Sequence, residues 1–559
     1  MHISDQKLNL HCPSNRLLQL YPIQFISSIM YSSLFAQPSC DIKTSKKLTD
    51  QPDDGISEKI IYRGEGNSSI VFALSNQAKV IRLLKKDGKI MKSSQDHHVT
   101  QHPMRSIKFI HLIMKPLTEP FLSGDPELIH LKSKFVNWLS STTEINRPRH
   151  RLDKTLHLDD QYALVMDDLC TLPIKLTRNL GQLDFIGPTL SIEIKPKQGF
   201  LPIYKPSVMA SSNNGFTSPK FTSSCLYGLT QNLKLARERI KERSNYCPIN
   251  LFSGCPVRMR SALEGLIRNP QNNLRIFKDL ILAYGESNQM KLTDTLREFF
   301  CENITQDANS TQACPLEQSL EDHLIDLVIS CLLNEHETRQ PKIYFRDCEN
   351  FGNSSDACPK HTPAAKCRRC DNFTCPKRVR TESTKSAHRL PKVCVLSSVL
   401  RAQRLDTIGP HEALRMLDWL IEDAKSSTSG VDILEELSKP QMPIGFGAQH
   451  QLVRETKQQY CFRKVWEFLV SLTAKDCSII ITMRQINPFR QRSIMERSPD
   501  VKRHLIKDHR SGKCYMFNVG IADLDQKMPL KISRLCDNLN FILQARDEVT
   551  STKDMSTIS

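Results

Sequence analysis

The stretch Lys59–Lys86, "KIIYRGEGNSSIVFALSNQAKVIRLLKK", decides how the N-terminal part of this chain is expected to fold. It holds three runs rich in β-branched residues, separated by Gly64 and Gly66 and then by Ser75-Asn76. Such runs bounded by turn residues predict three short strands joined by tight turns. A glycine turn lets backbone N–H groups approach phosphate closely, because glycine has no side chain in the way. A plain hairpin turn is the alternative interpretation.

Apolar periodicity outside this stretch predicts further strands and several helices. Strands are predicted within residues 161–173, 191–202, 477–486 and 514–525, and helices at 126–141, 226–243, 257–270 and 411–424. A small sheet lobe followed by a larger mixed lobe gives an α+β, two-lobed, kinase-like outline. The predicted boundaries are an unstructured extension at 1–54, an N-terminal lobe at 55–168, a C-terminal lobe at 169–545 containing a Cys- and His-rich insertion at 341–393, and a tail at 546–559.

The composition narrows the classes of partner. The 559 residues carry 77 Lys+Arg against 60 Asp+Glu, a formal net charge of +17. This charge favours nucleic acid, an anionic membrane or a polyanionic small molecule, without choosing among them. The 19 cysteines are too few for a disulfide scaffold of this length, so we expect a reduced, intracellular protein. Residues 17–35 are apolar but interrupted, which favours an unstructured extension over a secretory or membrane segment.

A second stretch, "SIEIKPKQGFLP" (Ser191–Pro202), places like charges side by side. Side chains alternate faces along a strand, so Glu193, Lys195 and Lys197 would share one face. The two ammonium groups repel unless an anion lies between them; a solvated edge strand guarded by lysines is the alternative. Other side chains that could bind the same anion are Lys234, Lys527, Lys531, the arginines Arg147, Arg149 and Arg151 of "NRPRHR", and Asn272 and Asn273 of "NPQNNLRIF".

Three aspartates stand where late strands are predicted to begin or end. Asp476 lies at the start of the strand in "AKDCSIIITM", and Asp523 and Asp525 lie two residues apart in "GIADLDQK". Phosphoryl transfer to an alcohol needs one carboxylate that receives or orients the hydroxyl proton and others that hold Mg²⁺ against nucleotide phosphates. Turn capping or strand-end solubility is the alternative interpretation of each aspartate alone.

In this order, the motifs resemble those of the inositol-pentakisphosphate 2-kinase family. The matching segments are "YRGEGNSSIV", "KVIRLLK", "EIKPKQGFLP", "LFSG", "NPQNNLRIF", "AKDCSIIIT" and "IADLDQK", which together touch most of residues 59–535. The resemblance implies a two-lobed fold distantly related to protein kinases. It also implies an enzyme that uses ATP and Mg²⁺ to phosphorylate the axial 2-hydroxyl of inositol 1,3,4,5,6-pentakisphosphate, giving inositol hexakisphosphate.

The resemblance also implies roles for individual residues. Those implied for the nucleotide are Gly64, Glu65, Gly66, Asn67, Arg82 and, at the hinge near adenine, Met166 to Asp168. Those implied for the inositol phosphates are Lys195, Lys197, Lys234, Asn272, Asn273, Lys527, Lys531 and Arg151, with Arg147 as the alternative arginine. Asp476 matches the catalytic aspartate, with Lys195 beside it, and Asp523 and Asp525 are the expected Mg²⁺ ligands. Leu535 departs from the pattern, because an aromatic residue is expected there; Arg534 could compensate.

The Cys- and His-rich insertion contains two close pairs, Cys358 with His361 and Cys367 with Cys370. Four such ligands suit tetrahedral Zn²⁺, which would clamp a small insertion that has little core. The resemblance implies a structural zinc in this general region in some family members. A basic loop with reduced thiols is the alternative.

Two rival functions compete with the kinase interpretation: a nucleic-acid-binding zinc protein, and an inactive scaffold that binds inositol phosphates. Aromatic residues make up only 7% and do not interleave with the basic runs, which argues against nucleic acid. The retained carboxylates argue against the inactive scaffold. We therefore expect a monomeric enzyme of the cytoplasm and nucleus, with no stable nucleic acid partner and no membrane partner.

Overall fold

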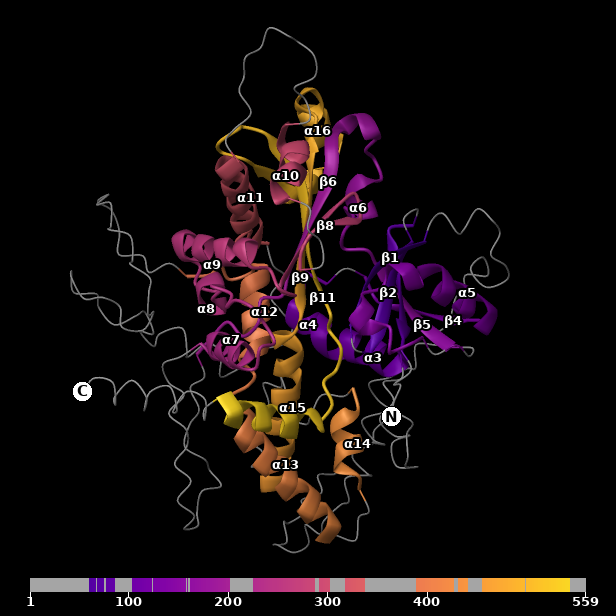
Figure 1. Ribbon diagram of the computed structural model, residues 1–559, viewed down its shortest axis with the longest axis vertical. Coiled ribbons are helices and arrows are strands. Elements are labelled where there is room, and N and C mark those ends of the chain that lie inside the picture. Colours follow the sequence, from indigo (N-terminus) through magenta and orange to yellow (C-terminus); the bar gives the residue numbers. More distant parts are fainter. Residues whose placement is uncertain are drawn as a thin grey trace, which may run out of the picture.

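The structure, a computed structural model, contains helices and two sheets and is α+β, as predicted (Figure 1). It describes residues 60–66, 68–74, 77–85, 103–122, 124–156, 158, 161–201, 225–286, 291–301, 317–336, 389–426, 431–440, 455–497 and 499–542. In Figure 1 the N-terminal strands lie to the right of the long central strands of the second sheet. Helices α8, α9 and α11 lie on the other side of those central strands in the same view.

The first sheet holds five strands in the order β1-β2-β3-β5-β4, and every neighbouring pair is antiparallel. They are β1 (Ile60–Glu65), β2 (Ser69–Leu74), β3 (Lys79–Leu84), β4 (Glu127–Leu131) and β5 (Gln161–Asp167). The three strands predicted from Lys59–Lys86 are therefore confirmed. Phe72, Ile81 and Leu83 form the core of this sheet together with apolar residues of α5 (Ser133–Thr143).

The helix predicted at 126–141 is wrong in its first half. Residues Glu127–Leu131 form β4, which pairs with β5, and only the part from Ser133 onward is helical. The apolar pattern there has period two as well as three to four, because Ile129 and Leu131 alternate with His130. Burial of Ile129 and Leu131 in the sheet core decides between the two periods.

The second sheet is the centre of the molecule. Its six strands run in the order β10-β11-β9-β6-β7-β8, and each neighbouring pair is antiparallel. They are β6 (Phe185–Ile194), β7 (Leu274–Lys278), β8 (Ile281–Tyr284), β9 (Ser478–Ile486), β10 (Leu505–Lys507) and β11 (Cys514–Ala522). The strand predicted at 477–486 is confirmed as β9, and the one predicted at 514–525 is confirmed as β11 only as far as Ala522, where the strand ends.

Helices surround both sheets. Before β6 lie α3 (Pro103–Phe109), η3 (Ile110–Met114), α4 (Lys115–Thr118), η4 (Glu144–Asn146), η5 (Arg149–Arg151), α6 (Ile174–Thr177) and η6 (Gln182–Asp184). After β6 lie α7 (Leu226–Ala236), α8 (Pro248–Leu251), α9 (Pro256–Arg268), α10 (Leu292–Cys301), α11 (Glu317–Leu332), α12 (Val395–Gln403), α13 (Gly409–Ser426), α14 (Ile433–Ser438), α15 (Lys457–Lys475), η8 (Pro488–Arg490), α16 (Gln491–Arg497), η9 (Pro499–His504) and a helix at 531–542.

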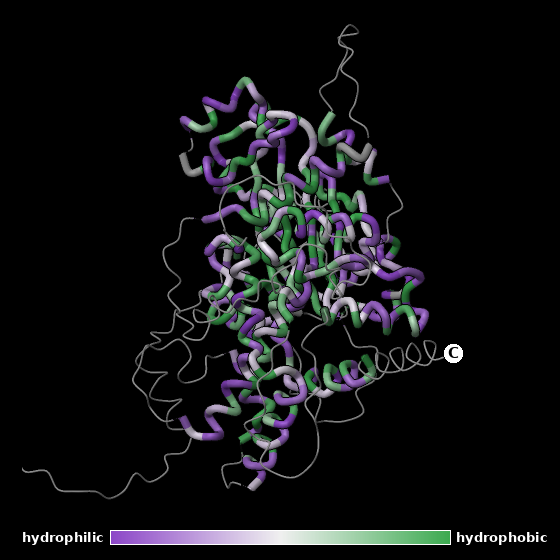
Figure 2. Tube along the Cα trace, turned by 90° about the vertical axis from the view of Figure 1, so that its left-hand side faces the viewer, coloured by the Kyte–Doolittle hydropathy of each residue, from purple (hydrophilic) through white to green (hydrophobic). Residues whose placement is uncertain are grey.

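The predicted helices at 257–270 and 411–424 are confirmed as α9 and α13, whereas the one predicted at 226–243 ends at Ala236. One large core joins the second sheet to these helices, with Trp466 and Phe468 of α15 fully buried in it. Figure 2 shows hydrophobic residues along the middle of the molecule and hydrophilic ones toward its outside. Among the described residues, none of the helices combines the length and apolar character that crossing a membrane requires.

Three central strands begin or end at one edge of the second sheet. Ile194, the last residue of β6, pairs with Ile479 of β9, and Ala522, the last residue of β11, pairs with Ser478. The chain leaves this edge abruptly, since Lys197 and Asp523 have φ of 59° and 60°. Residues other than glycine rarely adopt this left-handed conformation, and they do so mostly where surrounding contacts impose it. The edge is therefore where side chains from distant segments are held together.

Candidate active site

Two aspartates at this edge each bind lysines from other segments. Asp523 Oδ2 accepts hydrogen bonds from Lys195 Nζ at 3.0 Å and from Ser478 Oγ at 2.9 Å. Asp476, which caps the C-terminal end of α15, binds Lys527 Nζ at 2.7 Å and Lys197 Nζ at 3.4 Å. Both carboxylates remain about half exposed, at 46% for Asp523 and 52% for Asp476, so a ligand can reach them.

The neighbouring cations keep both aspartates ionised. Burial opposes ionisation of Asp476, but Lys527 and Lys197 outweigh it and hold the pKa of this carboxyl below its usual value. Burial likewise opposes ionisation of Asp523, and Lys195 with Arg82 holds its pKa well below the usual range. Two aspartates that stay charged beside lysines can orient a hydroxyl proton or bind a cation.

The lysines are also close to one another. Burial lowers the pKa of Lys197; Asp476 acts in the opposite direction, and the charges of Lys195 and Lys234 add to the lowering. Lys234, in the last turn of α7, is therefore near enough to contribute to the same cluster. Mutual repulsion among these ammonium groups is relieved when a polyanion binds between them.

The expected strand geometry of Glu193, Lys195 and Lys197 is wrong. The strand β6 ends at Ile194, so Lys195 and Lys197 lie on the following turn, and Glu193 is 5% exposed. The Ser478 hydroxyl lies 2.9 Å from Glu193 Oε1 as well as from Asp523 Oδ2, so its single proton bonds one of these oxygens at a time, and Glu193 also pairs with Arg275 at 2.5 Å. Since Ser478 also contacts Asp523, Glu193 and Ser478 connect Arg275 to the exposed aspartate.

Sequence reasoning missed Ser478 and Arg275, two members of this chain of contacts. Both lie inside segments that were recognised, "AKDCSIIIT" and "NPQNNLRIF", two residues after a residue chosen for its charge or amide. Arg275 also reaches the first sheet: a Cβ atom added at Gly64 would lie 2.8 Å from its guanidinium Nη1. With φ of 155° at Gly64, this close approach suits glycine.

The predicted nucleotide loop is mixed in character. Gly64 and Glu65 end β1, and the Gly66 N–H donates to the carbonyl of Ser69 at 2.9 Å, which closes the hairpin. Asn67 lies outside the described residues. Glu65 does not face solvent: its carboxylate is buried and pairs with Lys85 and with Arg147, whose Nε and Nη2 lie at 3.0 and 2.9 Å.

The arginine that binds this buried carboxylate, Arg147, lies between η4 and η5. Arg147 also donates to the carbonyls of Arg151 and Lys154, at 2.7 and 2.6 Å. Burial lowers the pKa of Lys85 despite its pairing with Glu65, and the charges of Arg147 and Arg151 lower it further. Arg147 and Arg151 therefore lie beside the glycine turn at the end of β1, rather than at the Asp476–Lys197 pair.

Replacing Arg147 by alanine is expected to lower the free energy of unfolding by about 3 kcal/mol, because removing one partner of a buried ion pair leaves an uncompensated charge. Urea unfolding followed by fluorescence measures it, since Trp138 packs against the core of the first sheet. The matched control is Arg149→Ala, an exposed arginine two residues away, which should change stability by less than about 0.5 kcal/mol. Equal effects of the two variants would contradict the structural role of Arg147.

Arg82 links the two sheets. From β3 it donates to Ser69 Oγ at 3.0 Å and binds both carboxylate oxygens of Asp525, one of them at 2.6 Å. Asp525 is thus committed to Arg82, whereas Asp523 has the exposed carboxylate. Carboxylate oxygens are suitable Mg²⁺ ligands, and Mg²⁺ commonly takes one or two of them together with substrate phosphates. Among the described residues, no group of three or more His, Cys, Asp or Glu side chains could hold a metal by itself.

The expected amide and helix residues lie at different depths. Asn273 is 2% exposed; its Nδ2 donates to Tyr227 Oη at 2.8 Å, and its buried Oδ1 has no hydrogen-bond partner among the described residues. Asn272 and Lys531 are exposed. Although Lys531 is exposed, the surrounding protein partly desolvates its ammonium group and lowers its pKa. The charge of Lys527 lowers the pKa further, so these two lysines are neighbours.

Leu535 and Arg534 occupy different environments on the last helix. Leu535 packs against the large core, while Arg534 is exposed on the same helix as Lys531. The leucine therefore has a packing role at the position where an aromatic residue was expected.

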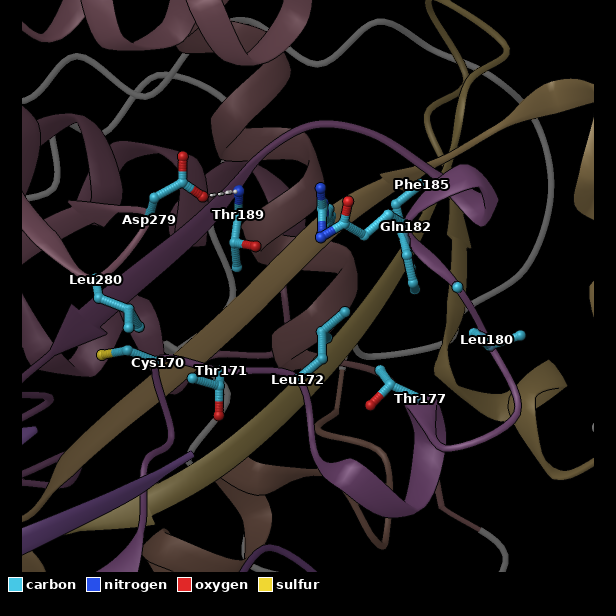
Figure 3. A pocket seen from close by; sticks show the side chains of 12 residues that line it. Cys170, Thr171, Leu172, Thr177, Leu180, Gln182, Phe185, Thr189, Asp279 and Leu280 are labelled. Carbon is cyan, nitrogen blue, oxygen red and sulfur yellow. Dashed lines mark hydrogen bonds between the residues drawn. The ribbon is translucent and has the colours of Figure 1, made fainter. Parts of the chain in front are cut away.

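Asp168, which was expected near the hinge, is buried and binds other parts of the fold. Arg63 Nη2 binds it at 2.5 Å and the N–H of Cys170 donates to it at 2.9 Å. A cavity of about 440 Å³ begins directly after it, lined by residues such as Cys170, Leu172 and Thr189 (Figure 3). We call the lysines and aspartates at the ends of β6, β9 and β11 the charged edge: Lys195, Lys197, Lys527, Asp476 and Asp523. None of them lines this cavity.

Four predicted features fall on residues that the structure does not describe. The four predicted zinc ligands, Cys358, His361, Cys367 and Cys370, lie outside the described residues, as does the basic run 377–380 of the nucleic acid alternative. The same holds for the extension at 1–54 and the tail at 546–559.

Comparison with known proteins adds the family. Residues 62–536 match the model of the family described as inositol-pentakisphosphate 2-kinase. The chain is similar to the inositol-pentakisphosphate 2-kinase of Danio rerio, with 26% identity over 484 residues, 83% of this chain and 88% of the relative. It is also similar to that of Drosophila melanogaster, with 26% identity over 51% of this chain and 56% of the relative. An Arabidopsis thaliana relative of the same name matches at 26% identity over 41% of this chain and 54% of its own length.

The matched span contains every strand of both sheets from β2 to β11 and all the lysines and aspartates of the charged edge. The chain therefore belongs to the inositol-pentakisphosphate 2-kinase family.

Proposed function

We propose that this enzyme performs the family reaction at the charged edge of the second sheet, with Asp476 as the residue that receives the acceptor proton. The oxygen of the 2-hydroxyl of inositol 1,3,4,5,6-pentakisphosphate attacks the γ-phosphorus of ATP. The bond from that phosphorus to the β–γ bridging oxygen breaks, ADP leaves, and the hydroxyl proton passes to the carboxylate. The products are inositol hexakisphosphate and ADP.

The observation that carries this assignment is the pairing of Asp476 with two lysines from different segments, Lys197 and Lys527. Phosphates on the inositol ring compete with the carboxylate for these ammonium groups, because charge-assisted hydrogen bonds to phosphate are strong. As the lysines turn toward the ligand, Asp476 loses the contacts that hold its pKa down and becomes a better proton acceptor. Substrate binding thus prepares the base.

Further cations would surround the remaining phosphates. Lys195, Lys234 and Lys531 lie near this pair by their mutual effects on pKa, and Asn272 is exposed beside Asn273. A ligand with five phosphates needs such charges from several elements, because each phosphate is close to doubly ionised near neutral pH. Arg534 is the exposed basic residue next to the packed Leu535.

We propose that the two sheets belong to the two lobes of a kinase-like fold, divided after Asp168. ATP would lie between these lobes. Gly64 and Gly66 would face its phosphates, and Arg82 would exchange Asp525 for a phosphate. Asp523 is the better placed Mg²⁺ ligand of the pair, since Asp525 is bound by Arg82. Bound Mg²⁺ would supply positive charge against the phosphate oxygens of the nucleotide.

We also propose the features that only the sequence supports. These are a monomeric enzyme of the cytoplasm and nucleus, without nucleic acid or membrane partners, and a structural zinc held by the Cys- and His-rich insertion. Metal analysis of the purified protein, before and after a chelator, tests the zinc.

The experiment that tests the function is an incubation of the purified protein with Mg·ATP and inositol 1,3,4,5,6-pentakisphosphate. The products are separated by charge, and phosphorus NMR locates the new phosphate. A phosphate at the 2-position supports the proposal, whereas binding without product would leave a scaffold. A protein that neither binds the inositol phosphate nor forms product would contradict both the kinase and the scaffold interpretations.

A further inference from the structure

The buried amide of Gln403 connects the two segments that carry Lys197 and Asp476. Gln403, the last residue of α12, has no exposed surface. Its Nε2 donates to the carbonyl of Lys197 at 2.7 Å and to that of Ala474 at 3.1 Å. Its Oε1 accepts from the N–H of Gly199 at 2.9 Å. One side chain therefore holds the turn after β6 against the end of α15.

The three partners leave this side chain no alternative orientation. Both Nε2 hydrogens face carbonyl oxygens and Oε1 faces an N–H, so rotating the amide by half a turn would set acceptor against acceptor. A glutamate of the same shape would place a carboxylate oxygen against two carbonyls. The site accordingly demands an amide of this length.

The bonds of Gln403 reach the turn at its most constrained point. Lys197 has φ of 59°, and its carbonyl is the group that Gln403 binds. A left-handed backbone is unfavourable for a residue with a side chain, so it persists only where contacts hold it. This conformation directs Lys197 Nζ toward Asp476, 3.4 Å away.

A second contact from the segment after α12 supports the same arrangement. Asp406 is buried and binds Lys475 Nζ at 2.6 Å, next to Asp476 in sequence. The same ammonium group lies over the ring of Phe200, 5.4 Å from its centroid. The residues just before Asp476 and just after Lys197 are thus held from one place in the fold.

We infer that Gln403, which touches no reacting atom, is a positioning residue that sets Lys197 and Asp476 relative to each other and thereby governs use of the inositol phosphate. This inference rests on the proposed function. Without the amide, both segments gain freedom: the Lys197 ammonium is misplaced for the substrate phosphates, and Asp476 for the acceptor hydroxyl. Misplacing Lys197 raises the KM for inositol pentakisphosphate, and misplacing Asp476 lowers kcat.

The test compares Gln403→Met with the wild type in steady-state assays of both substrates. We expect kcat to fall about tenfold or more, because misplacement by about 1 Å can cost on the order of 10²-fold in rate. The KM for inositol pentakisphosphate should rise severalfold, whereas the KM for ATP should stay unchanged. A purely structural role would reduce the amount of folded enzyme and lower the maximal rate alone, leaving both KM values as they were.

The matched control is Val399→Ala, one helical turn earlier on α12, where the side chain is also buried. It should lower the melting temperature while leaving both KM values and the kcat per folded molecule unchanged. Gln403→Asn, which keeps the amide but shortens the side chain, serves if the methionine variant does not fold, and a smaller effect in the same direction is expected.

The outcomes separate the two claims. A wild-type enzyme that makes no hexakisphosphate would overturn the proposed function. An active wild type together with Gln403 variants that keep both kcat and the KM for inositol pentakisphosphate would overturn the positioning role alone. A selective change in the inositol phosphate parameters of the Gln403 variants, absent from Val399→Ala, supports it.

Discussion

Asp476→Asn is expected to lower the rate of phosphoryl transfer by about 10²–10⁴-fold, the usual contribution of a positioned general base. The amide keeps the shape of the carboxylate but loses its charge and its ability to take the proton. Affinity for inositol pentakisphosphate should be retained or slightly increased, because Lys197 and Lys527 no longer have a carboxylate that competes with the ligand. Single-turnover assays measure the transfer, and calorimetric titration measures the affinity.

The control for this variant is Asp418→Asn, the same chemical change at an exposed position on α13. It should leave both transfer and binding unchanged. Weakened binding of the inositol phosphate by Asp476→Asn, with an unchanged transfer rate once it is bound, would show that Asp476 organises the lysines and does not accept the proton.

Gly199→Ala is expected to lower the free energy of unfolding by at least about 1–3 kcal/mol, the range for overpacking a tight interior. A Cβ atom added there would lie 2.2 Å from Cδ2 and 2.4 Å from Cγ of Phe252, a ring that is itself buried. The turn or the ring must move, and the turn also carries Lys197. We therefore expect activity to fall together with stability, which urea unfolding measures.

Two companion variants test the cause of this effect. Gly228→Ala adds the same methyl group inside α7, where no atom of the described residues beyond the helix's own backbone lies within 4 Å, so it should leave stability equal or slightly higher. The double variant Gly199→Ala, Phe252→Leu should recover part of the lost stability, because the two changes share one contact. Additive losses would mean that the ring is not the source of the strain.

The sequence could predict the members of the charged edge because each borders a recognisable apolar run. Asp476 precedes β9, Asp523 follows β11 and Lys195 follows β6, so their strands reveal them. Neighbouring antiparallel strands then bring these ends to one edge. The pattern of residues was enough for the first sheet as well, except where β4 carries both periods.

The partners of these residues could not be predicted from spacing. Arg82 and Asp525 are 443 residues apart in sequence, and Glu65 and Arg147 are 82 apart. No local pattern records such contacts, which only tertiary packing creates. Gln403 is a stronger example, because a single glutamine in a helix has no sequence feature that distinguishes it from a solvated one.

The turns at the edge were mispredicted for a physical reason. Extending β6 through Lys197 and β11 through Asp525 assumed that extended backbone continues, since a left-handed residue with a side chain is unfavourable by itself. Tertiary contacts reverse this preference: Gln403 binds the carbonyl of Lys197, and Lys195 and Ser478 bind Asp523. Constraints of this kind concentrate at functional sites.

The ion pairs of Asp476 also bear on how the product leaves. In the proposed mechanism Asp476 is neutral directly after the transfer; once it releases the proton it accepted, its carboxylate faces the new dianion at the 2-position of the product. The two like charges repel, and Lys197 and Lys527 regain a partner when the hexakisphosphate departs. An enzyme that gathers so many cations around a polyphosphate risks being inhibited by its own product. In the proposed mechanism, the aspartate that accepts the proton therefore also weakens the binding of the product.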